Sequence, residues 1–399
     1  MAPAATQIPP ATTDAPTKAS KTAYKGNINF ASLKLSDDEI QKEDETYEYN
    51  FLRPAFPKLD WEPLKTFEVL PDKAHLADPK NNFANLFRDA TTVTHINPKI
   101  GTEVTGVDLA NLDDEQKNEL ALLLATRVAV IFRDQKNLDI YKQLELGRYY
   151  GTLHKHATTS LPRDHEKDLE EVHVIWADEK RVPITAFPAT YLWHSDVTYE
   201  KQPPSYTSLK VLKAPSTGGD TLWISGYALY DALSPGLKEY LEGLTALHSG
   251  KEQADDARRK GTHVRREPVI TEHPLVRVHP VTGYKAVFVN PGFTRSIVGV
   301  PKAESDAILQ YLFNLIATTQ ESTVRFKWNK DDVVFWDNRI AVHTATYGFF
   351  PERRHGVRVT SHGEVPYYDP NGKSQQAVID AQLGIERNLD GSKGGSYND

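Results

Sequence analysis

The sequence contains no cysteine among its 399 residues. Without thiols the chain can form no disulfide, offers no thiolate nucleophile and cannot build a zinc–thiolate site or an iron–sulfur cluster. Any metal that it binds must therefore be held by histidine and carboxylate side chains. The first residues also lack the apolar stretch of a secretory signal, and no run approaches the ~18–20 apolar residues that span a bilayer. We therefore expect a cytoplasmic protein without a membrane partner.

A strong positive charge is also lacking. The formal net charge is −7, and no long basic run gives the chain the electrostatic footprint of a nucleic-acid-binding protein. We interpret the short basic cluster formed by Arg258-Arg259-Lys260 and Arg265-Arg266 as a solvated loop. With 39% apolar and 25% charged residues, the composition is that of an ordinary globular protein. Nucleic acid is therefore not expected among its partners.

The composition changes along the chain and divides it into four parts. Residues 1–25 are rich in Ala, Pro, Thr and Lys without periodicity, which predicts a disordered arm. Over 26–90, aromatic residues and prolines alternate with charges, a pattern that favours an extended segment wrapped over a core. One compact domain is predicted for 91–366. The remaining 367–399 are rich in Gly, Asn, Asp and Ser, which indicates a loose tail or one packed along the surface.

Short apolar runs separated by turns outnumber helical patterns within the compact domain. Helical spacing recurs in four windows, 113–124, 141–150, 226–244 and 305–317. Strands are predicted at 128–132, 206–212, 221–224, 276–279, 286–290, 333–336 and 356–360, with a strand, turn and strand over 93–107. Many short strands with a few inserted helices are typical of an α+β fold that is mostly β, a β-sandwich or jelly roll with helical cover.

A short motif, Trp193-His194-Ser195-Asp196, offers two metal-binding side chains. Residues two apart on an extended backbone point to the same side, so His194 and Asp196 can face one ion. About one such pair is expected by chance in a chain of this composition. A second pattern of similar form, His362-Gly363-Glu364, is also present. Taken alone, the motif is as well explained by a hydrogen-bonded surface pair.

A third ligand changes that interpretation. His343 follows a buried strand pattern, residues 332–336, and the polar turn Asp337-Asn338-Arg339. Two histidines and one carboxylate occupy one face of an octahedron and leave three positions open, the usual arrangement of non-haem iron(II) oxygenases. We interpret Asp337 and Asn338 as turn residues that orient His343, and Arg339 as a structural ion-pair partner.

Two arginines follow on one face of a predicted strand. In an extended segment Arg354, Gly356, Arg358 and Thr360 share a side, and Val357 and Val359 lie opposite. Two arginines on a buried face are costly without anionic partners. The face is therefore either exposed or lines a cavity that binds two separate anions, for which the planar guanidinium fork is well suited.

At this point the sequence resembles the taurine/2,4-dichlorophenoxyacetate dioxygenase family, which depends on iron(II) and 2-oxoglutarate, and most of all its fungal sulfonate dioxygenases. The resemblance runs from about Thr94 to Thr360 and rests on the order and separation of several blocks. These blocks are Gly101–Asp108, Leu153–His156, Trp193–Thr198, Pro203–Tyr206, Gly218–Trp223, His279–Gly283, Phe288–Asn290, Trp336–Arg339 and Pro351–Arg354.

The resemblance assigns roles to single positions and implies a double-stranded β-helix, the jelly roll with helical cover. His194, Asp196 and His343 match the iron ligands. Arg354 and Thr221 match the residues that hold the distal carboxylate of 2-oxoglutarate. The remaining matches are substrate positions, with Arg358 and His156 at the anionic head and Val197 and Phe293 around the rest of the pocket.

The implied reaction hydroxylates the carbon next to an anionic group of a small organic substrate, while O2 and 2-oxoglutarate are converted and succinate is formed. A sulfonate would then release sulfite and leave an aldehyde. One departure argues against taurine itself: where the family's taurine-specific members carry an amide side chain, this chain has Pro188-Ala-Thr-Tyr-Leu192, in which Thr190 substitutes only in part. The family is often oligomeric, so a homo-dimer or homo-tetramer is expected.

Other functions remain open at this stage. The same chemistry could act on a carboxylate or a natural product, by hydroxylation or desaturation, because Arg358 alone does not distinguish a sulfonate from a carboxylate. A non-catalytic ligand-binding jelly roll would leave the two arginines without a reason to face one site. A hydrolase is disfavoured because no nucleophile elbow is present. A halogenase is excluded because Asp196 fills the position that a halide would need.

Overall fold

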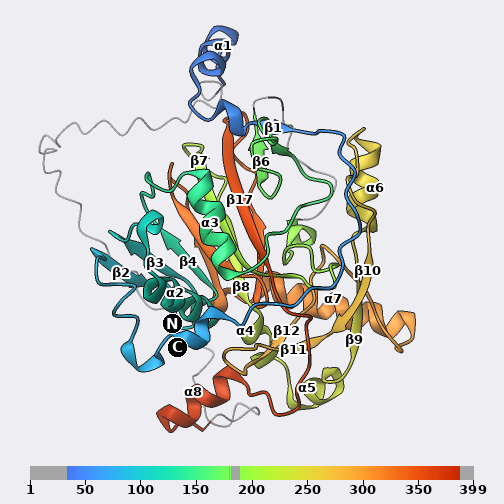
Figure 1. Ribbon diagram of the computed structural model, residues 1–399. Coiled ribbons are helices and arrows are strands. Elements are labelled where there is room, and N and C mark those ends of the chain that lie inside the picture. Colours follow the sequence, from blue (N-terminus) through green and yellow to red (C-terminus); the bar gives the residue numbers. More distant parts are fainter. Residues whose placement is uncertain (1–33, 179, 181–188, 387–399) are drawn as a thin grey trace, which may run out of the picture.

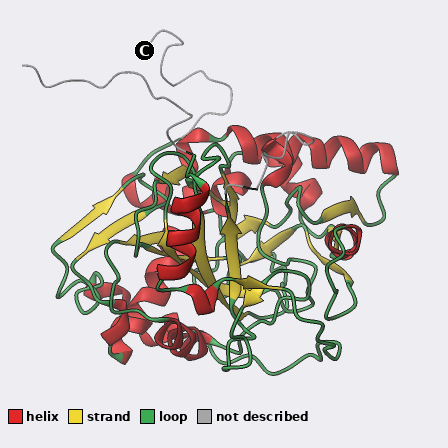
Figure 2. Cartoon of the chain, turned by 90° about the horizontal axis from the view of Figure 1, so that it is seen from above, coloured by secondary structure: helices red, strands yellow, loops and turns green. Residues whose placement is uncertain are grey.

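The computed structural model describes residues 34–178, 180 and 189–386 (Figure 1). The predicted disordered arm, residues 1–25, lies outside them. The described chain is mostly sheet with helices along the outside, as Figures 1 and 2 show. None of its helices is long and apolar enough to cross a bilayer.

The largest sheet has seven strands. Their order is β2 (Thr92–His95), β3 (Thr102–Thr105), β4 (Ala129–Phe132), β15 (Val333–Asp337), β7 (Pro204–Lys213), β17 (Arg354–His362) and β6 (His173–Ala177). Neighbouring strands are antiparallel except β3 and β4. The central strands β7, β15 and β17 are buried along almost their whole length. Two covered faces explain why β15 has a near-continuous apolar run, whereas β7 and β17 also carry buried polar and charged side chains.

A second sheet packs on the inner face of the first. Its strands are β14 (Thr323–Phe326), β8 (Thr221–Ser225) and β16 (Ala341–Ala345), all antiparallel. Because strand residues alternate, Trp223 of β8 and its register partner His343 of β16 point inward, while Ile224 and Val342 point outward. The rings of Trp223 and Trp336 lie 5.7 Å apart between the two sheets. This interface is the core on which the site is built.

Three smaller sheets complete the strands. They are β10 (Ile270–Pro274) with β9 (Thr245–Ser249) and β13 (Thr294–Ile297), β11 (Val276–Val278) with β12 (Lys285–Val287), and β1 (Pro54–Ala55) with β5 (Leu161–Pro162). The helices are α1 (Asp37–Thr46), α2 (Asp114–Arg127), α3 (Ile140–Tyr150), α4 (Gly226–Asp231), α5 (Pro235–Leu241), α6 (Lys251–Arg259), α7 (Lys302–Thr318) and α8 (Gln375–Leu383).

Helices cover both sheets from outside. Helix α2 begins at a capping box of Asp113 and Gln116, and together with α3 it covers the outer face of the seven-stranded sheet (Figure 1). Helix α7 presents Leu309, Leu312 and Ile316, spaced at helical intervals, to the outer face of the second sheet. The helical window 226–244 forms two helices rather than one, because Ser234 caps a new helix that starts at Pro235.

The segments outside the compact part both contact it. Residues 56–72 contain no helix or strand and run beside α6 (Figure 1), where the Trp61 backbone N–H donates to the carbonyl of Arg265. After residue 366, where the sequence predicts a loose tail, the chain forms α8. This helix is capped by Ser374 and anchored because Asp231 accepts hydrogen bonds from the Ser374 hydroxyl and the Gln376 backbone.

Candidate metal centre and substrate cavity

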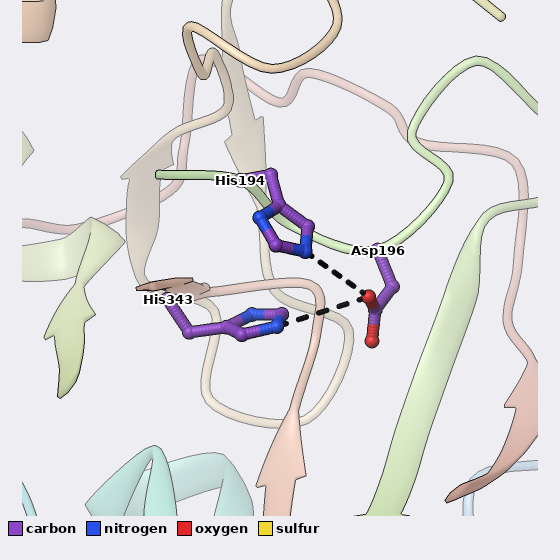
Figure 3. A group of neighbouring side chains, drawn as sticks. All are labelled: His194, Asp196 and His343. Atoms are coloured by element: carbon purple, nitrogen blue, oxygen red, sulfur yellow. Dashed lines mark ion pairs between the residues drawn. The ribbon is translucent and has the colours of Figure 1, made fainter. Parts of the chain in front are cut away.

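The two histidines of the predicted metal site are brought together by backbone pairing. His194 and His343 form an antiparallel bridge in which each backbone N–H donates to the other's carbonyl, at 2.9 and 2.8 Å. Side chains of directly paired residues lie on the same side, and the two imidazole rings are 4.3 Å apart between centroids. Figure 3 shows both rings turned toward Asp196.

Asp196 completes the cluster. Its Oδ1 lies 3.6 Å from Nε2 of His194 and 3.8 Å from Nε2 of His343 (Figure 3). One ligand atom from each side chain falls within 4.8 Å of the others, the one such cluster within the described residues. In the second sequence pattern, Glu364 is paired with Arg277 and Arg339, and His362 faces the carbonyl of Gln202. That pattern therefore forms no metal site in the described part of the chain.

The donor set fits a divalent metal. Oδ2 of Asp196 is buried and has no hydrogen-bond partner among the described residues, although a buried carboxylate oxygen is normally satisfied. Nδ1 of His194 contacts the carbonyl of Leu192 at 2.8 Å. That nitrogen must carry the proton to make this contact, so Nε2 presents its lone pair to the cluster. Two imidazole nitrogens and one carboxylate are the ligand types of a non-haem Fe(II) centre.

Local electrostatics keep these groups in the form that binds a metal. Burial lowers the pKa of both imidazoles, that of His343 to about 3, so both rings are neutral at neutral pH. Burial alone would raise the pKa of Asp196, but the Arg358 guanidinium holds it below its ordinary value. The carboxylate is therefore ionised.

Asn338 fixes the position of Asp196 rather than that of His343. Its Oδ1 accepts from the Asp196 backbone N–H at 2.7 Å, and its Nδ2 donates to the Asp196 carbonyl at 3.0 Å. The next residue, Val197, has a φ of 39°, a strained conformation for a β-branched side chain. The two hydrogen bonds from Asn338 hold this turn, which directs the carboxylate of Asp196 at the histidines.

Arg354 and Thr221 meet at one end of the cavity beside the cluster. The Arg354 guanidinium is 3% exposed, and its Nη2 donates to the hydroxyl of Thr221 at 3.3 Å. The same hydroxyl accepts from Nε1 of Trp328 at 3.0 Å. With two donors already on its oxygen, Thr221 has its own proton left to donate to a carboxylate.

Arg358 lies next to the metal cluster, four residues along β17 from Arg354. Its Nη1 donates to Oδ1 of Asp196 at 2.6 Å, and its Nη2 donates to Nδ1 of His173. The third donor, Nε, is buried and has no hydrogen-bond partner among the described residues. A buried guanidinium with an unused N–H is a binding group for an anion.

His156 contributes a second donor beside Arg358. The Thr158 backbone N–H donates to its Nδ1 at 3.3 Å, so the proton sits on Nε2. Burial and the neighbouring His173 hold the pKa of His156 well below its ordinary value, which keeps the ring neutral. Both His156 and Arg358 line the cavity together with Thr221, Arg354 and the metal cluster.

The cavity has a volume of about 680 Å³ and reaches from the metal cluster to the surface. Val197 and Phe293 lie in its wall and pack together with Tyr199. The Phe293 ring stands edge-on to the His194 ring, with 6.1 Å between centroids. All nine residues that the sequence singled out, the three metal-cluster residues and His156, Val197, Thr221, Phe293, Arg354 and Arg358, therefore border one space.

Comparison with known proteins agrees with this geometry. The family model "Taurine catabolism dioxygenase TauD, TfdA family" matches residues 92–360. The chain belongs to this family. A "putative alpha-ketoglutarate-dependent sulfonate dioxygenase" of Schizosaccharomyces pombe is 46% identical over 351 residues, 87% of this chain and 88% of that protein. The alpha-ketoglutarate-dependent sulfonate dioxygenase of Saccharomyces cerevisiae is 36% identical over 402 residues, 92% of this chain and 96% of that protein.

A solved structure of the family is similar throughout its length. The crystal structure of a taurine dioxygenase from Burkholderia xenovorans has a TM-score of 0.60 and 32% identity, and the match covers 71% of this chain and 94% of that chain. The enzyme class predicted from the sequence, a 2-oxoglutarate-dependent dioxygenase, is confirmed. Fe(II), 2-oxoglutarate and O2 as its cofactor and cosubstrates are confirmed with it.

Sequence reasoning missed two residues of this dioxygenase site. His173 is the register partner of Arg358 between β6 and β17, and no local motif marks it. Arg265 was interpreted as part of a solvated loop, which is wrong: it is 1% exposed, and its Nη2 donates to the carbonyls of His156 and Thr159. It thereby supports the loop that carries His156, while its own guanidinium lies 5.1 Å from the Trp61 ring.

Three other residues singled out from the sequence have different environments in the structure. Arg339 is a structural ion-pair partner, as predicted, because it contacts Asp337 and Asp72 at 2.6 Å each. Arg266, also interpreted as part of the solvated loop, is buried and pairs with Glu200 at 2.8 Å, whereas Arg258, Arg259 and Lys260 are exposed. Thr190 is exposed and does not line the cavity, and Pro188 lies outside the described residues.

Proposed function

We propose that this chain oxidises organosulfonates at the carbon that bears the sulfonate group. One atom of O2 enters that carbon and the other enters succinate, which forms from 2-oxoglutarate with loss of CO2. The resulting 1-hydroxysulfonate breaks its C–S bond, so the products are an aldehyde and sulfite. The observation that carries the proposal is Arg358, a buried guanidinium with an unused Nε beside the metal cluster and beside the donor His156.

His194, Asp196 and His343 would hold the Fe(II) ion. When bound, the ion supplies the activation of O2 at the expense of 2-oxoglutarate; the chain supplies ligands, orientation and water exclusion. Arg354 and Thr221 would bind the distal carboxylate of 2-oxoglutarate, since together they offer a charged fork and a hydroxyl proton.

Arg358 and His156 would bind the sulfonate. Three oxygens on sulfur can accept from the Nε of Arg358 and from the Nε2 proton of His156. The wall of Phe293 and Val197 would exclude water from the carbon to be oxidised. A carboxylate is the competing anion, and it has only two oxygens in one plane to share between the same donors.

We also infer the finer architecture and assembly that the family implies. The face-to-face packing of the seven-stranded and three-stranded sheets supports a double-stranded β-helix, the jelly roll. We further propose a cytoplasmic homo-oligomer, for which light scattering after size-exclusion chromatography gives a direct mass.

The test measures sulfite, aldehyde and succinate after addition of Fe(II) and 2-oxoglutarate, across alkyl sulfonates, sulfate esters and carboxylates. Sulfite in equal amount to succinate is expected from a sulfonate. H194A and D196A should abolish both products, whereas H75A, at an exposed histidine far from the cluster in sequence, should retain them. Succinate formed only with carboxylates would overturn the sulfonate assignment, and an active H194A or D196A enzyme would overturn the ligand assignment.

A further inference from the structure

We call the part of the cavity wall that lies away from the metal cluster the outer wall. It is built from segments other than the strands that carry the cluster. Pro54 and Phe56 come from the N-terminal segment, and the α6 region contributes Gln253, Asp256, Ala257, Lys260 and Thr262. The N-terminal segment precedes residue 92, where the family match begins. Its position is fixed because β1 (Pro54–Ala55) pairs with β5 (Leu161–Pro162). The substrate chain beyond the sulfonate therefore meets a segment, through Pro54 and Phe56, that lies before the family match.

Charge in this outer wall is already compensated. Apart from Asp196 and the two arginines, the charged residues that line the cavity are Asp256 and Lys260 among the described residues. They form an ion pair with each other at 2.6 Å, and Arg259 contacts the same Asp256 at 3.3 Å. An ammonium group in the substrate would have to compete with two cations for this carboxylate, and burial of an unpaired ammonium is strongly unfavourable.

Two apolar side chains at the rim are exposed in the part of the chain that the structure describes. Phe56 is 53% exposed and Tyr191 is 50% exposed, and both line the cavity. Deeper in the wall, Ile175, Leu192 and Phe293 continue the apolar surface toward the cluster. Large exposed apolar side chains around a concave site indicate binding of an apolar ligand. A volume of about 680 Å³ also leaves room well beyond a two-carbon chain.

We infer that the substrate is a sulfonate with an uncharged, apolar carbon chain of several carbons, and that the N-terminal segment, through Phe56, selects for that chain. The inference rests on the proposed function and specifies its substrate class.

A matched pair of substrates tests the charge of the chain. Propane-1-sulfonate and 2-aminoethanesulfonate have the same length and differ by a methyl group in place of an ammonium. The Fe(II)-loaded enzyme should show a kcat/KM at least about tenfold higher for propane-1-sulfonate, because Asp256, the carboxylate of the outer wall among the described residues, is already paired with Lys260 and Arg259. An equal or higher kcat/KM for 2-aminoethanesulfonate would overturn the inference.

Chain length and Phe56 provide the second test. Each buried methylene is worth up to about fourfold in kcat/KM, so hexane-1-sulfonate should exceed propane-1-sulfonate by about tenfold or more. F56A should lower this hexane-to-propane ratio by about threefold or more. L76A, which removes another exposed apolar side chain of the same N-terminal segment outside the cavity, should leave it unchanged. Thermal denaturation of both variants controls for folding.

The outcomes separate the two proposals. If sulfite is released but kcat/KM is equal for hexane-1-sulfonate and propane-1-sulfonate, the inference about the carbon chain is overturned and the proposed function stands. The same follows if sulfite is released but F56A leaves the hexane-to-propane ratio unchanged. No sulfite from any sulfonate, with succinate formed from another substrate class, would overturn both.

Discussion

Replacing Asn338 is the most informative test of how the metal cluster is positioned. Its side-chain amide belongs neither to the cluster nor to the cavity wall. N338A deletes an acceptor 2.7 Å from the Asp196 backbone N–H and a donor 3.0 Å from the Asp196 carbonyl. Asn338 is fully buried and Asp196 is 3% exposed, so solvent cannot replace either bond without rearrangement. The carboxylate should then lose its fixed direction toward His194 and His343.

Two effects of different size are expected. A buried backbone donor left unsatisfied costs about 1–3 kcal/mol, which for a chain of this size lowers the Tm by about 1–4 °C. The second effect is on the metal: loss of a residue that orients a ligand weakens metal binding by about 10–100-fold. The strained φ of 39° at Val197 should increase this effect, since the turn relaxes once the amide is gone.

Calorimetric titration with Co(II), which avoids the air oxidation of Fe(II), measures the affinity, and thermal denaturation without metal measures stability. N371A provides a matched control, because Asn371 is exposed and its side-chain amide donates to the neighbouring Asp369, far from the cluster in sequence. If the Tm falls but the Kd for Co(II) stays within twofold of the parent, Asn338 stabilises the fold without orienting the metal ligand. An unchanged Tm together with an unchanged Kd would refute the reasoning altogether.

Three further predictions concern other parts of the site. R354K keeps the positive charge but loses the two-pronged guanidinium, so the KM for 2-oxoglutarate should rise at least about tenfold while the KM for the sulfonate stays constant. R354A should raise the KM for 2-oxoglutarate further. Equal effects on the KM of both substrates in steady-state kinetics would contradict the assignment. H173L removes the acceptor for Nη2 of Arg358 and should raise the sulfonate KM about five- to tenfold. H173N, whose Oδ1 can replace Nδ1, should restore part of the loss, and no rescue would argue that His173 only fills space. Burial raises the pKa of Glu200, but the hydrogen bond from His154 and the charge of Arg266 outweigh it and bring the pKa to about 2. The stabilisation is therefore present above about pH 4.5 and lost as the pH falls toward 2. In denaturant unfolding at pH 7, E200Q should have a lower free energy of unfolding than the parent, and the difference should disappear in acid. A difference that does not depend on pH would show that the Glu200 charge is not its cause.

Sequence spacing was sufficient to predict the parts of the site whose residues are close neighbours along the chain. The i and i+2 relation of His194 and Asp196, and the shared face of Arg354 and Arg358, follow from extended backbone alone, and the structure places all four along one cavity. Helices α2 and α3 were predicted because helical spacing of apolar residues is a local signal. The family blocks then identified Thr221 and His156.

The contacts that sequence spacing could not reveal are set by long-range register. His173 meets Arg358 only because β6 pairs with β17, and Arg265 is buried because the chain around α6 folds back under Trp61. Asn338 holds Asp196 through a contact across 142 residues. In each case the residue type is ordinary for its local segment, and the partner decides its role. The 226–244 window shows the converse, because a local signal decides the structure there: the cap at Ser234 begins a second helix within a window that apolar periodicity predicted as one.

The buried contacts of the N-terminal segment bear on how this enzyme can be divided. Leu52, Ala74 and Leu86 are each at most 2% exposed, and Asp72 contacts both Arg339 and the hydroxyl of Tyr206. A protein trimmed to the span of the family match would expose that apolar surface and remove one carboxylate from a buried arginine, which favours aggregation. The start of the family match at residue 92 is therefore not a boundary of the folding unit. Transplanting the segment between relatives would exchange a piece of hydrophobic core and a piece of the substrate pocket in one step, so stability and selectivity are expected to change together.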